Sequence, residues 1–430
     1  MLLIYKIFCY LNYPLWMILL LVRKFKGKEH KKRYIEKLGY GYLERPKGDV
    51  IWVHALGLGE TLSLTLFIEV LAQHHKNNTV LFTSSTLHSF IAFNKVSLSN
   101  NVIHQFAPVD SVISVRRFLN HWKPSICLIS ELDLWPIRII EAKKYGIKMF
   151  LFNSRMNKKK RNDRLAFSSV LAKTLASFDA IFLQDEESIN YFQSFGVPRN
   201  KISVCGSFKA AGSLMAKDHR LIEKLKYWSE GKLVWIAASI HEDEETEILE
   251  AFIKARKLIQ NLILIIAPRN LESVKMIEKK FNLYPYKAMT RRLEDEFPDL
   301  DTEIMLVSTV GEMGSFYNQA DIAFIGNSLD FKRIKTGKNP FEAIQEKCVV
   351  IHGPKMLEPS YAEISKLGIS EIVFNKEDIS KALLRYVSRT EREIKIQRGL
   401  DFLKKNRKVI EQFSMKVIRA NKKGTKLLSP

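Results

Sequence analysis

The stretch Ile51-Trp-Val-His-Ala-Leu-Gly-Leu-Gly-Glu60 decides the fold of this chain. Its apolar start predicts a buried strand, and Gly57 and Gly59 predict a tight turn that a residue with a Cβ would resist. Glu60 then opens a helical segment that runs to Val70. Open α/β sheets bind ligands at the carboxyl ends of their strands, so Glu60 is a candidate general base. A carboxylate that stabilises the helix dipole is the alternative interpretation.

Short apolar runs, each followed by a polar helical pattern, continue on both sides of this stretch. They predict parallel sheets covered on both faces by helices. The first series is Val50–His54, Thr79–Thr83, Ile126–Ser130, Lys148–Asn153, Ala180–Gln184 and Lys201–Gly206. The second series is Leu233–Ala237, Leu262–Ala267, Glu303–Leu306, Ile322–Ile325 and Val349–Ile351. We therefore predict an α/β protein with two doubly wound domains that face a cleft and are joined near Gly206–Ser229.

The charge balance indicates an anionic partner. Among 430 residues, 68 are Lys or Arg and 46 are Asp or Glu, which gives a net charge of +22. Such an excess is typical of proteins that bind nucleic acid, an acidic membrane or a phosphorylated substrate. The chain lacks interleaved basic and aromatic motifs, which argues against nucleic acid. The four cysteines are far apart and show no metal-ligand spacing, so we expect structural thiols in a reducing compartment.

The N-terminal segment favours a membrane. Ile7–Val22 is almost wholly apolar and carries the aromatic residues that favour a bilayer interface, and the basic run Arg23–Arg33 follows directly. The segment is short for a full span, and Asn12 and Pro14 interrupt it. No small-residue cleavage site follows. We predict an uncleaved anchor that spans the bilayer or lies in its interface, with its basic flank on anionic lipid; a buried N-terminal helix is the alternative.

Two polar segments of the first half follow predicted strands. Glu131 comes directly after Ile126–Ser130 and lies near a tryptophan, so it is either a substrate carboxylate in a partly dry pocket or part of a helix start. Arg155 ends the segment Asn153-Ser-Arg155 and leads into the basic run Lys158–Arg161. That run is either a solvated face or a contact for lipid phosphates.

The second half offers candidates for a nucleotide. Ser239 is expected to cap a helix whose free amides bind an anion, and the consecutive carboxylates after it stabilise that helix and do not converge on a metal. Arg269 follows Leu262–Ala267 directly and suits a phosphate. Further along, Gly311-Glu312 forms a turn before a helix. The loop Gly337–Glu342 leads into another helix, where Glu342 either binds sugar hydroxyls or caps the N-terminus of that helix.

Taken together and in order, these segments resemble the motifs of the 3-deoxy-D-manno-octulosonic acid (Kdo) transferases of lipopolysaccharide synthesis. The similar segments are His54–Glu60 (family His-Ala-x-x-x-Gly-Glu), Glu131–Pro136 (Glu-Thr-Glu-Leu-Trp-Pro), Asn153–Arg155 (Asn-Ala-Arg), Gly206–Lys209 (Gly-Asn-Leu-Lys), Ala237–Glu242 (Ala-Ala-Ser-Thr-His-Glu), Pro268-Arg269 (Pro-Arg-His), Gly311-Glu312 (Gly-Glu) and Asn339–Glu342 (within His-Asn-Pro-x-Glu-Pro). No single tetrapeptide is specific, but the ordered set covers nearly the whole chain.

The resemblance implies a GT-B glycosyltransferase that transfers Kdo from CMP-Kdo to a phosphorylated lipid A precursor with inversion, using no metal or cofactor. It implies a membrane anchor over residues 1–28, an acceptor domain over 29–207, a nucleotide-sugar domain over 208–392, and a helix over 393–430 that returns to the acceptor domain. Together with the positive-inside rule, it implies an N-terminally anchored enzyme of the inner (cytoplasmic) membrane whose catalytic domains face the cytoplasm.

The resemblance also implies roles for individual residues. Glu60 is the catalytic base. The acceptor side carries Glu131, Lys209 and Arg155. The nucleotide-sugar side carries Ser239, Arg269, Gly311, Glu312, Asn339 and Glu342.

Three residues depart from the family pattern. Lys338 stands where the family has His, Asn270 where it has the His after Pro-Arg, and Ala343 where it has Pro. Lys338 keeps a hydrogen-bond donor but loses a titratable imidazole. A GT-B transferase with another nucleotide sugar and lipid acceptor is therefore an alternative, and a membrane-bound carbohydrate- or nucleic-acid-binding protein without catalysis is a second one.

Overall fold

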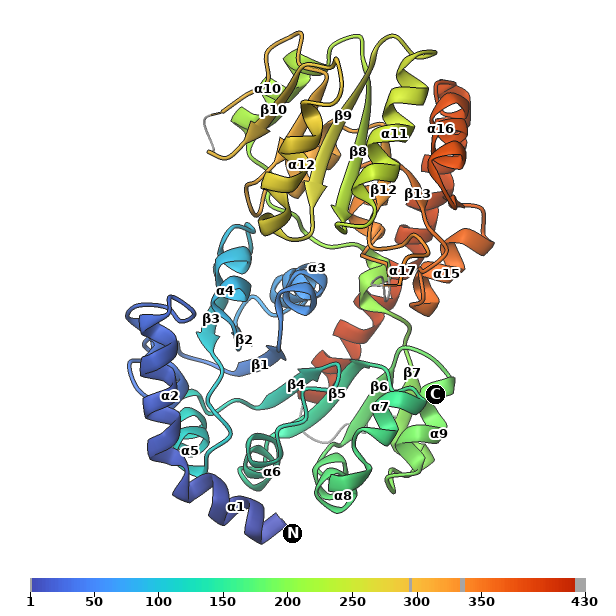
Figure 1. Cartoon of the computed structure of the whole chain (residues 1–430). Helices are drawn as coiled ribbons and strands as arrows, with labels where there is room; N and C mark the ends of the chain where they lie inside the picture. The colour runs from blue at the N-terminus through green and yellow to red at the C-terminus, as the bar shows by residue number, and fades with distance from the viewer. Residues whose placement is uncertain (1, 294–295, 333–336, 422–430) are drawn as a thin grey trace. The chain divides into compact units, whose positions relative to one another are not determined.

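The chain forms two compact units. The computed structural model describes all residues except 1, 294–295, 333–336 and 422–430. Unit 1 comprises Met1–Leu214 and Asn406–Pro430, and unit 2 comprises Met215–Lys405. Each unit is a parallel sheet of seven strands with helices on its faces, which confirms the predicted α/β, doubly wound fold class (Figure 1).

The strands of unit 1 follow the order β3-β2-β1-β4-β5-β6-β7. Their bounds are β1 Val50–Ala55, β2 Thr79–Ser84, β3 Val102–Phe106, β4 Ile126–Ser130, β5 Lys148–Ser154, β6 Ala180–Leu183 and β7 Ile202–Val204. The chain winds outward from β1 in one direction and then resumes at β4 on the other side of β1. The switch point, where such sheets bind their ligands, therefore lies between β1 and β4.

The helices of unit 1 cover both faces of this sheet. They are α1 Leu2–Leu11, α2 Tyr13–Phe25, η1 Arg33–Leu38, α3 Leu58–His74, α4 Leu87–Asn94, α5 Val112–Trp122, α6 Pro136–Lys144, α7 Lys158–Asn162, η2 Leu165–Phe167, α8 Ser168–Ala176, α9 Glu187–Gln193, η3 Arg199–Lys201 and η4 Phe208–Ala211. On one face, α3 packs with the C-terminal part of α17 (Arg389–Asn421), which contributes Ile410, Phe413 and Val417 to the core. On the other face, α5, α6 and α8 pack around Phe118, Ile139 and Leu175 (Figure 1).

Unit 2 repeats this architecture. Its sheet has the order β10-β11-β9-β8-β12-β13-β14, so its switch point lies between β8 and β12. The strands are β8 Leu233–Ile240, β9 Leu262–Pro268, β10 Ala288–Arg291, β11 Ile304–Val307, β12 Ile322–Ile325, β13 Val349–His352 and β14 Ser370–Ile372. The helices are α10 His219–Ser229, α11 Glu245–Arg256, η5 Leu271–Ser273, α12 Val274–Phe281, α13 Met313–Gln319, α14 Phe341–Gln345, α15 Pro359–Lys366 and α16 Lys376–Arg385. One face of the sheet is buried under α11, α12 and α16.

Two details of the sequence interpretation were wrong. The turn after β1 does not depend on glycine, because Gly57 has φ −115° and ψ 176°, and Gly59 lies within α3 with open space around its missing Cβ. Ser239 does not cap a helix: it lies in β8 with φ +57°, and α11 begins only at Glu245.

The apolar N-terminal segment is a pair of helices, not one. α1 and α2 meet at Asn12 with a bend of 56°. Among the described residues no single helix is long and apolar enough to cross a bilayer. The two helices of this bent pair, taken together, have the length and the apolar composition for it. The pair is also attached to unit 1 by polar side chains. The Tyr5 hydroxyl donates to Asp110 Oδ2 at 2.8 Å, and Lys6 forms an ion pair of 3.1 Å with Glu141.

Candidate active site

Glu60 lies at the switch point of unit 1, in the first turn of α3. Its Oε2 accepts hydrogen bonds from the backbone amides of Leu56 at 3.0 Å and Gly57 at 2.9 Å. This is the capping arrangement that sequence reasoning offered as the alternative to catalysis. Among the residues that the structure describes, none donates a hydrogen bond to Oε1 of Glu60. One carboxylate oxygen therefore fixes the side chain while the other is left to accept a proton.

Glu131 directly follows β4, the strand beside β1. Its backbone adopts φ +56°, which turns the chain sharply at the strand end, and the Ser154 hydroxyl donates to its carbonyl. Lys209 Nζ lies 3.6 Å from Glu131 Oε1. The structure thus brings together two of the residues that were assigned to the acceptor side, and it places Glu131 just after the strand that pairs with β1, the strand before Glu60.

The Arg155 side chain binds Asp185. Its Nε donates to Asp185 Oδ2 at 2.7 Å, and Asp185 also accepts from the Ser188 amide at 2.9 Å. The guanidinium therefore ties the end of β5 to the start of α9. This contact gives Arg155 a structural role and leaves its acceptor role a prediction.

A buried polar network beneath the switch point was missed by the sequence interpretation. His54 Nε2 lies 2.5 Å from Asp133 Oδ2, and Arg138 Nη1 lies 2.8 Å from that nitrogen and 3.2 Å from that oxygen. Burial, then the Arg138 charge, lowers the pKa of His54, while His54 and Arg138 hold the pKa of Asp133 below its usual range despite burial. This direction favours the neutral imidazole. Because Arg138 only donates, the Asp133 carboxylate is the acceptor that His54 and Arg138 share, and the imidazole proton lies on Nε2.

This tautomer extends the network across β1 and β2. With its proton on Nε2, His54 accepts at Nδ1 from the Thr83 hydroxyl at 2.8 Å, and Thr83 accepts from Trp52 Nε1 at 2.8 Å. Arg138 Nη2 also donates to the Pro108 carbonyl at 3.0 Å. The loop that follows β4 is thereby fixed to the strand that carries Glu60.

In unit 2 the cationic candidates gather at the ends of β8 and β9. Arg269 is exposed, and its backbone amide donates to the Ile240 carbonyl at 2.9 Å, next to Ser239. Lys338 is close enough to Arg269 that, after burial, the Arg269 charge is the next cause that lowers the Lys338 pKa. Lys338, which replaces the family's histidine, therefore adds a second donor to the same region.

Glu244 was interpreted from the sequence only as one of several carboxylates at a helix start. It is fully buried and accepts from four amides: His241 at 2.8 Å, Asn327 at 2.6 Å, Ser328 at 2.8 Å and Leu329 at 3.0 Å. Its carboxylate thus joins the loop after β8 to the loop after β12 at the switch point. Glu245, the next residue, instead pairs with Lys280.

Gly311 and Glu312 form a loop that is held from β10. Gly311 has φ +88°, a conformation that favours glycine. The Glu312 carboxylate receives two hydrogen bonds from the buried Arg291, Nε to Oε2 at 3.1 Å and Nη2 to Oε1 at 2.7 Å, and the Thr309 hydroxyl also donates to it. The side chain of Glu312 therefore shapes the loop, and the assignment of Gly311 and Glu312 to the nucleotide stays a prediction.

Asn339 and Glu342 lie at the start of α14, where the Asn339 amide donates to Glu342 Oε1 at 3.3 Å. Burial raises the pKa of Glu342 to about 7, against the opposing effect of that hydrogen bond. A carboxyl group in this state can donate a hydrogen bond below neutral pH and only accept above it.

We expect Glu342 to make stability depend on pH. Its folded pKa of about 7 exceeds the reference value of 4.5, so folded protein binds the proton more tightly between these values. The contribution is fully present below pH 4.5 and is lost as pH rises through about 7. Thermal unfolding at pH 5 and pH 8 should show wild type losing up to about 3 kcal/mol relative to Glu342→Gln over that interval. A difference between the two proteins that stays constant with pH would contradict the assignment.

Among the described residues, no group of three or more His, Cys, Asp or Glu side chains is placed to hold a metal ion. The expectation that the reaction needs no metal or cofactor stays a prediction.

Comparison with known proteins decides the family. Residues 32–211 match the family model described as "3-Deoxy-D-manno-octulosonic-acid transferase (kdotransferase)". The "Probable 3-deoxy-D-manno-octulosonic acid transferase, mitochondrial" of Arabidopsis thaliana is 32% identical over 359 residues, which cover 81% of this chain and 79% of the plant protein. The chain belongs to the Kdo transferase family. It is therefore a glycosyltransferase that transfers Kdo.

A bacterial relative of this Kdo transferase supports the same conclusion, and a solved structure shares its fold. The 3-deoxy-D-manno-octulosonic acid transferase of Haemophilus influenzae is 26% identical over 408 residues, or 93% of this chain and 94% of that protein. A solved structure described as a putative UDP-N-acetylglucosamine 2-epimerase from Listeria monocytogenes matches with a TM-score of 0.53 and 12% identity, covering 88% of this chain and 98% of that one. The likeness shows the fold alone, two Rossmann-like units of the GT-B type.

Proposed function

We propose that this Kdo transferase uses CMP-Kdo as donor and a phosphorylated, acylated lipid A precursor as acceptor, with inversion at the anomeric carbon. Unit 1 binds the acceptor and unit 2 binds the donor. The observation that carries the proposal is the position of Glu60 at the switch point of unit 1, where two backbone amides fix Oε2 and leave Oε1 to act.

In the proposed reaction, Oε1 of Glu60 removes the proton of the acceptor's primary hydroxyl as the hydroxyl oxygen attacks the anomeric carbon of Kdo. The bond between that carbon and the phosphate oxygen breaks, and CMP leaves with the electron pair. Arg269, Lys338 and the backbone amides of the loop at Gly311 are the groups of unit 2 that would stabilise the charge developing on the phosphate. Glu131 and Lys209 would orient the acceptor beside Glu60.

Mass spectrometry of the products tests this proposal. Purified protein, CMP-Kdo and a tetra-acylated, bis-phosphorylated glucosamine disaccharide should yield the precursor with Kdo attached. UDP-sugars added in excess should neither replace CMP-Kdo nor compete with it. Transfer from a UDP-sugar in place of CMP-Kdo would overturn the donor assignment and favour the alternative that the departures at Asn270, Lys338 and Ala343 leave open.

We also propose that α1 and α2 lie in the bilayer interface and do not cross it, with the two units in the cytoplasm. The support is the polar attachment of α1 to unit 1 and a row of apolar side chains on the outer side of both helices. The exposed large apolar residues of the pair are Leu3, Ile4, Ile7, Phe8, Tyr10, Leu11, Leu15, Met17, Ile18, Leu19, Leu21, Val22 and Phe25. A helix crossing the bilayer would have to give up the ion pair of Lys6 with Glu141.

Removal of residues 1–27 is expected to release most of the protein from membranes. The deletion takes away the exposed apolar side chains, while basic segments such as α7 remain and retain some binding to anionic lipid at low salt. Flotation with anionic vesicles at low and high salt measures the effect, and circular dichroism checks the fold. If the truncated protein floats as completely as the intact one at high salt, the anchor assignment is wrong.

Arg269→Ala is expected to weaken use of the donor by about 1.5–3 kcal/mol in kcat/KM, the usual size of a hydrogen bond to a charged group. Steady-state kinetics with each substrate varied in turn measures the effect. The KM for the lipid acceptor should stay near the wild-type value, and Arg269→Lys, which keeps the charge, should recover part of the loss. An equal rise in the KM for donor and acceptor would contradict the assignment of Arg269 to the donor.

A further inference from the structure

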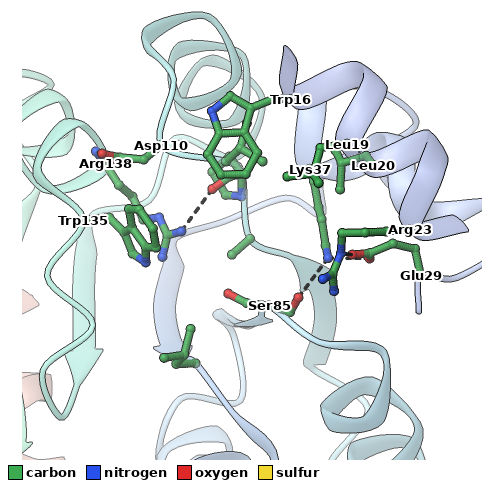
Figure 2. A pocket seen from close by; sticks show the side chains of 14 residues that line it. Trp16, Leu19, Leu20, Arg23, Glu29, Lys37, Ser85, Asp110, Trp135 and Arg138 are labelled. Carbon is green, nitrogen blue, oxygen red and sulfur yellow. Dashed lines mark hydrogen bonds and ion pairs between the residues drawn. The ribbon is translucent and has the colours of Figure 1, made fainter. Parts of the chain in front are cut away.

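A pocket of about 190 Å³ lies in unit 1 between the N-terminal helix pair and the carboxyl edge of the sheet (Figure 2). One wall is α2, through Trp16, Leu19, Leu20 and Arg23. The others come from η1 and the loop before it, from the residues that follow β1, β2 and β3, and from the loop and helix after β4. Their lining residues are Glu29, Lys37, Leu56, Ser85, Ala107, Pro108, Val109, Asp110, Trp135 and Arg138. The helix that we assign to the membrane thus also closes a pocket at the edge where the site lies.

The two sides of the pocket differ in chemistry. On one side, Glu29 accepts from Arg23 at 2.6 Å and from Lys37 at 2.5 Å, so two cations share a single carboxylate. Lys37 Nζ also donates to the carbonyl of Ser85 at 2.8 Å. Away from these charged groups, the indole rings of Trp16 and Trp135 line the pocket (Figure 2). A cationic end and aromatic walls suit a phosphorylated sugar, because the cations attract phosphate and the rings pack against the apolar faces of the sugar.

One lining residue of the pocket is hydrogen-bonded to the proposed base. Leu56, which is 39% exposed and lines the pocket, donates its amide hydrogen to Glu60 Oε2 at 3.0 Å. In the proposed interfacial position of α2 the pocket would border the bilayer, since Leu15 and Ile18 on α2 are exposed beside Trp16 and Leu19. Its volume is below the roughly 300–1,000 Å³ of sites that enclose a whole small ligand, so it holds only part of a headgroup.

We propose that α2 is a wall of the acceptor site as well as part of the anchor. The acceptor lipid stays in the bilayer beside the outer side of α2 while one phosphorylated sugar of its headgroup enters this pocket. The sugar packs on Trp16, its phosphate lies toward Arg23 and Lys37, and the hydroxyl to be glycosylated reaches Glu60. This inference rests on the proposed lipid acceptor. It means that a foreign membrane anchor would restore attachment but not acceptor binding.

Two single substitutions on α2 separate the two roles. Trp16→Ala removes a wall of the pocket, and Ile18→Ala removes an exposed apolar side chain that does not line it. The assay uses the full-length protein with the lipid precursor in non-ionic detergent micelles, where attachment to a bilayer plays no part. We expect Trp16→Ala to raise the KM for the acceptor at least fivefold with the KM for CMP-Kdo unchanged. Ile18→Ala should leave both KM values unchanged, and Trp16→Phe should recover most of the loss.

The outcomes are distinct. A Trp16→Ala protein with wild-type acceptor KM would overturn the inference, as would an equal rise in Ile18→Ala. If wild type transfers no Kdo, the proposed function fails, and the wall is then judged from binding alone by the shift in Tm that the lipid precursor produces. A shift in wild type and Ile18→Ala that is lost in Trp16→Ala supports the wall, whereas the same shift in all three overturns it.

Discussion

Glu60→Gln is expected to lower kcat by about 10²–10⁴-fold, the usual contribution of a positioned general base. The primary hydroxyl of a sugar is too weak an acid to ionise near neutral pH, so its attack depends on a group that takes the proton in the transition state. The glutamine carbonyl can still accept from the amides of Leu56 and Gly57, as Oε2 does now. Its amide nitrogen then takes the place of Oε1, and a donor stands where the proton must be accepted.

The same variant separates catalysis from capping. If Glu60 only caps α3, the glutamine variant should lose stability and keep full turnover in its folded fraction. Measuring Tm and kcat on one preparation distinguishes these results. Glu69→Gln is a matched control on the same helix, because Glu69 accepts from the amide and hydroxyl of Ser99 and has no proposed part in the reaction. Near-normal turnover by the Glu60→Gln protein would remove the general-base assignment.

Asp133→Ala is expected to cost about 3–5 kcal/mol of stability, which is typical when one partner of a buried ion pair is removed. Asp133 is 6% exposed, and its loss leaves the Arg138 guanidinium and the His54 Nε2 proton without their shared acceptor. Chemical denaturation followed by circular dichroism measures the change. Asp133→Asn retains one acceptor oxygen and should lose less.

The control for this prediction is a solvent-exposed ion pair on the protein surface. Asp301 pairs with Lys287 at 2.6 Å, but the Asp301 side chain is 69% exposed. Asp301→Ala should therefore leave the denaturation midpoint where it is in the wild type. A similar loss of stability in Asp133→Ala and Asp301→Ala would show that the buried network has no special contribution.

The interior of both sheets could be predicted from the sequence, and three of the edge strands could not. The central strands are buried on both faces, so they read as unbroken runs such as Leu262–Ala267. The missed strands β3, β10 and β14 each lie at an edge of a sheet. Their sequences VIHQF, AMTR and SEI are short and carry polar residues, so no unbroken apolar run marks them. Each of them is a strand because it pairs with the adjacent strand of the sheet. That strand is distant in the sequence, so the local residues do not reveal the pairing.

The residues of the candidate site could also be predicted only in part. Glu60 and Glu131 could be found because each follows a recognisable strand, and the sheet order then places those two strands side by side. The His54–Asp133 contact joins residues 79 apart, and the contact from Glu244 to the Ser328 amide joins residues 84 apart. No local pattern encodes such pairs, so the sequence alone does not show which residues His54 and Glu244 contact. Ser239 shows the opposite error, since a capping residue type at a strand end need not begin a helix.

The path of α17 has a consequence for how the protein is made. The chain leaves unit 1 at Leu214, builds all of unit 2, and returns at Asn406. Ile410, Phe413 and Val417 then fill one core of unit 1 together with Phe67 and Phe152. During synthesis, which proceeds at about 5–20 residues per second, the first half of the chain therefore waits with an incomplete core until the residues of α17 are added. Unit 2 is encoded without interruption and is therefore the part that can complete its fold first.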